Sequence, residues 1–235
     1  MEVTTIGLDI AKRVFQAHGT DASGKAVLRR KLQRPEVLAF FAALPPCLVG
    51  IEACSTAHYW AREITALGHE VRLMPASYVK PYVKRGKTDA ADAEAISEAV
   101  TRPTMRFVPI KTAEQQAVLM LHRTRDLLVR QRTMLVNALR GHMAELGVIA
   151  PQGIRRVGDL VAVLLGEDET TLPKLARHAL RGLAAELAAL GDRVKEIEVA
   201  ILAWHKDNEL SRRLATIPGV GPITVPSRVV LKLPG

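Results

Sequence analysis

The sequence predicts an α/β domain with a mixed sheet and flanking helices, followed by a long helical region. Two patterns predict this fold class. Strand-like runs first alternate with helical segments in the order βββαβαβα. From Thr112 onward the strand signals nearly vanish, and leucines recur at helical spacing. We therefore expect an α/β domain over residues 1–105, a helical coiled-coil arm over 112–205 with an insert at 147–179, and the start of a further helical domain over 210–235.

The first three predicted strands lie close together in the sequence. Residues 3–10 and 13–20 are strand-like runs joined by a tight Ala-Lys turn. Residues 26–32 follow the turn sequence Asp21-Ala-Ser-Gly24 and supply a third strand. Strands joined by such short connections are expected to form a β-meander.

A helix and a buried strand follow the meander. Arg34-Pro-Glu opens a helical stretch that runs to Leu44, and Pro45-Pro46 ends it. The apolar run 47–51 suits a buried strand, and it places Glu52 at the strand's carboxyl end.

The remaining elements of the first domain are two helices and one strand. Residues 56–67 carry helical periodicity that ends at Gly68, a residue common after helix ends. Residues 70–74 are typical of a strand, and residues 89–100 of a helix.

The helical region contains two long apolar patterns, separated by a segment rich in proline and glycine. One helix of about thirty-five residues is marked by Leu121, Leu128, Leu135, Leu139 and Leu146. A heptad seam with alternating spacings of three and four is formed by Leu180, Leu183, Leu187, Leu190, Val194, Ile197 and Ile201. The pair predicts an antiparallel coiled-coil arm or a dimerisation stalk, and an ordinary helical bundle stays open as the alternative.

The charge of the chain favours a polyanionic partner. Its formal net charge is +9 and its pI is about 9.9, and the basic residues, which include Arg29 and Lys232, are spread along the chain. A folded basic surface of this kind suits nucleic acid. The alternative is that the charge serves only solubility.

The cysteines and apolar runs exclude other classes. Cys47 and Cys54 are the two cysteines, too few for a disulfide framework or a four-ligand zinc site. Proline or charge interrupts every apolar run before it reaches the length of a membrane span, and no signal peptide is recognisable. We expect a cytoplasmic, nucleoid-associated protein with no membrane contact.

Four acidic residues stand where these elements would converge. Asp9 lies in the first strand, Glu52 ends a buried strand, and Asp89 and Asp92 share one face of a helix. Clustered carboxylates repel one another unless a cation lies among them, and Mg²⁺ favours oxygen ligands. Two such cations activate a water or hydroxyl and stabilise the leaving oxygen of a phosphodiester. We expect all four acids to be catalytic residues and ligands of a two-metal Mg²⁺ site.

Each acid, taken singly, has an ordinary structural explanation. Asp89 can cap its helix with Asp92 in the first turn, and Asp9 can simply end its strand. Glu52 is different, because a carboxylate after an apolar strand is partly buried and needs a partner. The joint pattern therefore carries more weight than any single acid.

Basic residues and two glycines are candidate nucleic-acid contacts. The candidates beside the acids are Lys84, Arg85 and Lys87, and those along the arm are Arg123, Arg125, Arg130, Arg132 and Arg140. Gly219 and Gly221 lie in a segment similar to the hairpin of a helix-hairpin-helix, where backbone N–H groups approach a DNA phosphate. Solvated helix faces and a plain turn are the structural alternatives.

Five segments occur in a specific order and spacing between about residue 3 and Thr224. They are I-G-L-D-I-A-K, G-I-E-A-C-S-T-A-H-Y-W-A-R, E-V-R-L-M-P, V-K-P-Y-V-K-R-G-K-T-D-A-A-D-A-E-A-I and L-V-R-Q-R-T-M-L-V-N-A-L-R-G-H. Together they resemble the insertion-sequence transposases related to Piv-type DNA invertases.

This resemblance implies a fold, an activity and partners. The fold is a RuvC-like, RNase H-type domain whose D-E-D-D acids bind magnesium, followed by a coiled coil and a C-terminal domain with a serine nucleophile. The activity is Mg²⁺-dependent DNA strand cleavage and exchange. The partners are double-stranded DNA of the element ends and target, an element-encoded guide RNA, and further copies of the chain through the coiled coil.

The sequence departs from the family pattern near its end. The segment 214–224 resembles the opening of the C-terminal domain, and Gly235 is reached before a serine in the family's glycine-rich context. Ser227 stands in V-P-S-R-V-V, so no serine nucleophile is assigned in this chain. We expect a C-terminally truncated transposase that is inactive alone, with 225–235 produced by truncation or a frame change.

Two other functions stay open. One is a stand-alone resolvase-like nuclease that cuts DNA with the four acids alone and leaves a free 5′ phosphate. The other is a non-catalytic fragment that binds DNA or RNA and oligomerises with the intact transposase through the heptad seam.

Overall fold

The computed structural model describes residues 2–84, 88–149, 157–165 and 172–223. The chain divides into two compact units, and the division falls between Gln116 and Ala117. No helix in the described part of the chain is long and apolar enough to cross a membrane.

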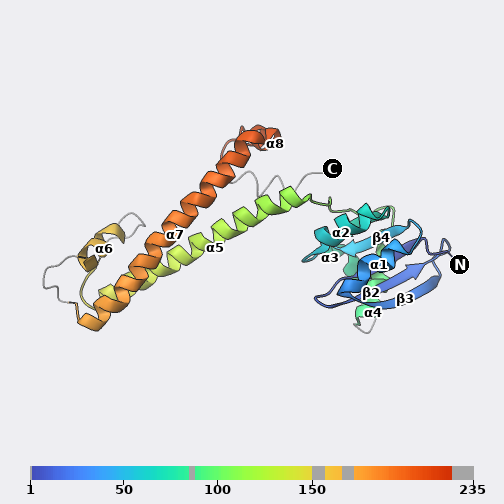
Figure 1. The fold of residues 1–235 in the computed structure, drawn as a ribbon, viewed down its shortest axis with the longest axis horizontal. Helices are drawn as coiled ribbons and strands as arrows, with labels where there is room; N and C mark the ends of the chain where they lie inside the picture. Colours follow the sequence, from blue (N-terminus) through green and yellow to red (C-terminus); the bar gives the residue numbers. More distant parts are fainter. Residues whose placement is uncertain (1, 85–87, 150–156, 166–171, 224–235) are drawn as a thin grey trace. The chain divides into compact units, whose positions relative to one another are not determined.

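The first unit is built on a five-stranded mixed sheet with the order β3-β2-β1-β4-β5 (Figure 1). The strands β1, β2 and β3 pair antiparallel, whereas β4 and β5 continue the sheet in parallel with β1. The predicted meander and both later strands are therefore present, and the topology is consistent with an RNase H-like fold. The strands are β1 (Thr5–Asp9), β2 (Val14–Thr20), β3 (Ala26–Gln33), β4 (Leu48–Glu52) and β5 (Glu70–Met74).

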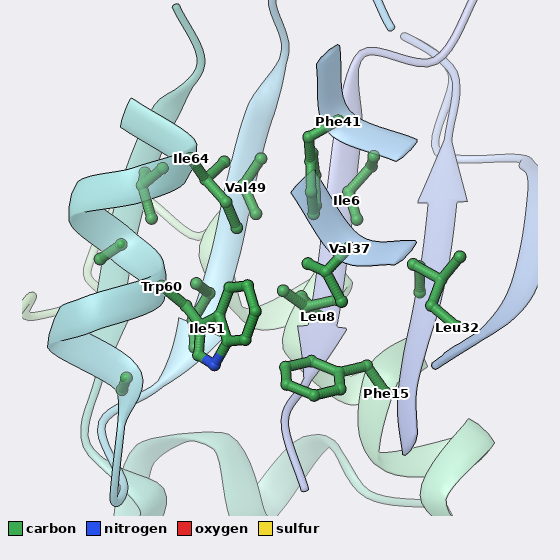
Figure 2. Close-up of a cluster of buried hydrophobic side chains, with 14 of the residues drawn as sticks. Ile6, Leu8, Phe15, Leu32, Val37, Phe41, Val49, Ile51, Trp60 and Ile64 are labelled. Atoms are coloured by element: carbon green, nitrogen blue, oxygen red, sulfur yellow. The ribbon is translucent and has the colours of Figure 1, made fainter. Parts of the chain in front are cut away.

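One face of the sheet packs against α1 (Val37–Ala42) and α2 (Ala57–Ala66). A single turn, η1 (Arg34–Glu36), leads into α1. Figure 2 shows the apolar side chains between these elements, including Ile6 and Leu8, which are fully buried. Burial of each such side chain contributes roughly 1.5–3 kcal/mol. Apolar side chains from the strands, α1 and α2 therefore form this core.

The other face of the sheet packs against α4 (Asp89–Val100). Gly7 of β1 and Gly50 of β4 are direct neighbours in the parallel ladder. A Cβ added at Gly7 would lie 2.1 Å from the carbonyl oxygen of Ala93, and one at Gly50 would lie 2.8 Å from the Cβ of Val100. The backbone of α4 thus rests directly on Gly7, and the side chain of Val100 rests on Gly50, which sets the height of α4 above the sheet.

Two short elements link β5 to α4 and were not predicted. They are α3 (Ala76–Val79) and the turn η2 (Lys80–Tyr82). Both are too short to show a helical period, and the prolines at 75 and 81 obscure them further.

The second unit contains two long helices that run antiparallel side by side (Figure 1). The helices α5 (Ala113–Ala144) and α7 (Lys174–Asp207) match the two long patterns in the sequence. All seven positions of the heptad seam are buried or half-buried, and the seam of α7 packs against α5. Two shorter helices, α6 (Val157–Leu165) and α8 (Glu209–Leu214), complete the described part, and α6 lies in the predicted insert.

Candidate functional site

Strand alternation places two of the acids on the face of the sheet that α4 covers. Gly7 and Gly50 contact α4, so the residues two positions later, Asp9 and Glu52, point to the same side. Since β1 and β4 are parallel neighbours, their carboxyl ends meet at one edge of the sheet. Both carboxylates are half-buried there.

The first turn of α4 supplies the other two acids. Thr88 is the N-cap, because its side-chain oxygen accepts a hydrogen bond from the N–H of Ala91 at 3.2 Å. Asp89 is therefore the first helical residue, and the alternative that it serves as the N-cap is wrong. Asp92 is half-buried, whereas Asp89 is exposed.

Three of the four acids line one pocket of about 680 Å³. Asp89 is not among the lining residues. The pocket also carries two lysines from the segment between β5 and α4 and one cysteine from the segment after β4. Its lining comprises Asp9, Ile10, Glu52, Cys54, Ala76, Val79, Lys80, Val83, Lys84 and Asp92.

The pKa of Asp9 responds to the charges of the other three acids. The pKa of this carboxyl is raised from 3.8 to about 6. Burial is the largest cause, and the negative charges of Asp92, Asp89 and Glu52 follow in that order. The hydrogen bond from the N–H of Ile10 acts in the opposite direction. The charged form of Asp9 is therefore disfavoured in the folded protein.

The oxygen donors of these acids suit a hard cation such as Mg²⁺, but the side chains lie too far apart to surround one ion. Carboxylate oxygens are the ligands that Mg²⁺ prefers. Within residues 2–84, 88–149, 157–165 and 172–223, no group of three or more Asp, Glu, His or Cys side chains lies close enough to hold one metal ion. Asp9, Glu52 and Asp92 line one pocket, and their negative charge and oxygen donors suit a cation, although they do not form a closed coordination shell.

The segment after Glu52 is held in an unusual backbone conformation. Ala53 donates its N–H to the carbonyl oxygen of Met74 at 2.7 Å, which ties the segment to β5. Thr56 has a φ of 71°, in the left-handed region that few non-glycine residues occupy. Cys54 lies between them in the pocket, where burial and then the charges of Glu52 and Asp9 raise its thiol pKa. The thiol is thus protonated and a poor nucleophile at neutral pH.

The predicted basic contacts beside the acids are described only in part. Lys84 lines the acidic pocket and forms an ion pair with Glu94 at 2.5 Å. Arg85 and Lys87 lie outside the described residues. Lys80, which was not predicted as a contact, borders the same pocket from η2.

The five arginines of α5 differ in their surroundings. Arg123 and Arg130 are exposed, whereas Arg132 and Arg140 are half-buried. Arg125 is also half-buried, and it forms an ion pair with Glu198 of α7 at 2.7 Å. This pair offers a structural role for Arg125 within the helix pair.

The glycine segment after α8 forms a turn. The N–H of Val220 donates to the carbonyl oxygen of Ile217 at 3.0 Å, and Gly219 has a φ of +79°. With proline at 218, this is the pattern of a type II turn, which requires a positive φ at the position of Gly219. Gly221 follows the turn, and Ser227 lies outside the described residues.

The fold and the acids together define a class. Carboxylates at the ends of two parallel strands and on the helix above them are consistent with a nucleic-acid enzyme of the DEDD type. A family model described as a transposase, DEDD_Tnp_IS110, matches residues 6–147, which is more than half of the chain. The chain belongs to this DEDD transposase family.

Curated relatives are named as transposases. The chain is 45% identical to a putative transposase, y4pF/y4sB, of Sinorhizobium fredii, over 99% of this chain and 59% of the relative. It is 48% identical to a probable family 20 transposase of Pseudomonas aeruginosa, over 95% of this chain and 67% of the relative. It is 40% identical to the transposase for insertion sequence element IS1328 of Yersinia enterocolitica, over 94% of this chain and 66% of the relative. The chain thus spans about three fifths to two thirds of the length of these relatives.

Proposed function

We propose that this chain carries the metal-dependent DNA-cutting site of an insertion-sequence transposase. Asp9, Glu52, Asp89 and Asp92 are the proposed Mg²⁺ ligands and catalytic residues. The observation that supports the proposal is the pocket that Asp9, Glu52 and Asp92 line together, with the charge of Asp89 also acting on Asp9.

The residues of the chain have separate roles in this proposal. Asp9 and Glu52 are fixed by paired strands, and Asp92 is fixed by a helix that rests on the sheet. Bound Mg²⁺ supplies Lewis-acid activation of a phosphodiester and of the attacking water or hydroxyl. Lys84 lies at the same pocket, where its charge attracts the phosphate backbone.

The wider reaction belongs to a longer protein in this proposal. Strand exchange uses a serine nucleophile from a C-terminal transposase domain, together with the acids. An element-encoded RNA pairs with the donor and target DNA and selects the sequence. Both statements are carried over from the transposase family that the five sequence segments resemble.

Binding of Mg²⁺ tests the proposal without requiring turnover. Mg²⁺ should raise the thermal unfolding temperature of the chain, since a ligand that binds the folded state alone stabilises it. The rise should be lost in Asp9→Asn and Glu52→Gln and retained in Asp207→Asn, which removes an exposed acid of α7. An equal rise in all four proteins would overturn the metal site.

Cleavage provides the second test. Branched DNA and Mg²⁺ should be incubated with the chain, and the products examined for a 5′ phosphate or a protein adduct. A free 5′ phosphate supports hydrolysis by the acids alone. An unchanged substrate at a saturating Mg²⁺ concentration would show that the acids need the rest of a longer protein for catalysis.

A second candidate function is oligomerisation with other copies of the chain or with the intact transposase. An exposed apolar stripe on α5 favours it: Met120, Leu127 and Met134 repeat every seven residues and are 63%, 47% and 69% exposed. Such a stripe suits helix–helix association. Sedimentation of the chain should reveal a dimer or larger species that is lost when all three residues are changed to Gln, and a monomeric chain would exclude this function.

A further inference from the structure

Pairing between β1, β2 and β3 places a row of residues beside Asp9, across the sheet. Asp9 is paired with Gln16 of β2, and Gln16 is paired with Lys31 of β3. The adjacent row on the same face runs from Gly7 through His18 to Arg29. Because side chains alternate along a strand, Gln16, Arg29 and Lys31 point to the face that carries Asp9 and α4.

These residues border a second pocket, next to the start of α4. The pocket has a volume of about 330 Å³ and lies between β2, β3 and the first turns of α4. Arg29 and Lys31 are exposed at its edge, and neither side chain forms a salt bridge within the described residues. The carboxylate of Glu94 also lines the pocket, but it is paired with Lys84. The pocket therefore has an excess of positive charge on its sheet side.

We propose that Gln16, Arg29 and Lys31 form a phosphate-binding track that continues from the acidic site and holds the DNA strand next to the scissile phosphodiester. This inference rests on the proposed function. Neighbouring strands lie about 4.8 Å apart, so the backbone of Lys31 is about 10 Å from that of Asp9. The long side chains of Arg29 and Lys31 can then reach the phosphates on either side of one held at the acids.

The arrangement of charges suits a nucleic-acid backbone. The acidic pocket repels a phosphate unless a cation is present, whereas the track attracts phosphates without one. Gln16 is half-buried between the two and offers both a donor and an acceptor. A DNA strand that follows the track passes the basic residues first and then reaches the acids, so the charges define its path across the sheet.

Protection of a sheet edge is the competing explanation for these charges. Basic residues on an edge strand prevent pairing with other chains, whichever face they occupy. Arg30 separates the two explanations. It borders the same pocket and is exposed like Arg29, but strand alternation directs its side chain to the opposite face, with Leu28 and Leu32. Arg30 is therefore the matched control.

The salt dependence of DNA binding tests the track. The full chain should be titrated against fluorescein-labelled single-stranded DNA over a range of NaCl concentrations, in the absence of Mg²⁺. The slope of log K against log salt is negative. Removing one side chain that binds a phosphate should make it less steep by about 0.7. We expect this decrease in Arg29→Gln and Lys31→Gln, about twice that decrease in the double variant, and no change in Arg30→Gln.

The outcomes separate the track from the proposed function. Equal slopes for Lys31→Gln and Arg30→Gln, with normal binding by the unmodified chain, would overturn the track and leave the DNA-cutting site in place. Absence of DNA binding by the unmodified chain would overturn both. An effect of Lys31→Gln on an RNA strand of the same sequence, with none on DNA, would also overturn the track as a DNA site. Unchanged thermal unfolding of each variant verifies that the fold is intact.

Discussion

Glycines within the strands of the first unit and glycines within the long helices of the second lie in opposite environments. In the sheet unit, an added Cβ at Gly7 would collide with the backbone of α4 at 2.1 Å, and one at Gly50 would lie 2.8 Å from Val100. In the helical unit, a Cβ at Gly141, Gly182 or Gly191 would meet nothing within 4 Å. The sheet unit thus depends on the absence of side chains to position its acids, whereas the helical unit depends on apolar side chains along a seam. Substitutions should therefore have different costs in the two units.

The largest effect is expected from Gly7→Ala. The methyl group cannot fit between β1 and α4, so the free energy of unfolding should fall by about 3 kcal/mol and Mg²⁺ binding should be lost. Urea unfolding in a Trp204→Phe background reports on the sheet unit alone, because Trp60 is then the remaining tryptophan. A change of less than about 1 kcal/mol would mean that α4 is not seated on the glycine.

The next effect is expected from Asp9→Asn. The folded-state pKa of Asp9 is about 6 rather than 3.8, so its ionised form destabilises the fold at high pH, and this cost disappears as the pH falls through 6 toward 3.8. In Mg²⁺-free buffer, the variant should be more stable than the parent by about 1–2 kcal/mol at neutral pH and above, after allowance for solvent screening. The gain should vanish near the ordinary pKa of Asp. Chemical unfolding of both proteins across this pH range measures it, and a gain independent of pH would contradict the assignment.

A smaller effect, an increase in stability, is expected from Gly182→Ala. This glycine is exposed in the middle of α7 with open space around it. Alanine loses less backbone entropy in a helix, so the helical unit should gain about 0.5–1 kcal/mol. Thermal unfolding followed by circular dichroism measures the gain. A decrease in stability here would break the contrast between the two units.

The smallest effect is expected from the ion pair between Arg125 and Glu198. A half-exposed pair of this kind contributes about 0.5 kcal/mol. A double-mutant cycle with Arg125→Gln and Glu198→Gln should give a coupling energy of that size, and salt should reduce it. If Arg125→Gln instead weakened DNA binding and left stability unchanged, the arginine would belong to the nucleic-acid surface and not to the helix pair.

Local patterns in the sequence were sufficient to predict most elements of the fold. Strand-like runs and turn signals predicted the five strands, and regular apolar spacing predicted the two long helices. The helix start at residue 89 also followed from its sequence, but the identity of the cap did not. Thr88 and Asp89 are both good N-caps, and local propensity alone cannot choose between them.

The site was less predictable because it depends on pairing between distant segments. The positions of Asp9 and Glu52 at strand ends could be predicted, since each strand ends where its apolar run ends. The row that joins Asp9 to Lys31 could not, because register is a property of the pair of strands and not of either sequence. Lys80 was missed because it lies in a turn that has no periodic signal.

The seat of α4 on Gly7 and Gly50 also has a consequence for synthesis on the ribosome. The meander of β1, β2 and β3 is complete once residue 33 has emerged, whereas Asp92 emerges about 80 residues after Asp9. Until β4 and α4 are available, no surface exists on which the acids can meet. A nascent or interrupted chain therefore lacks the proposed Mg²⁺ site until α4 has been synthesised, so the order of synthesis prevents a partly made chain from assembling it.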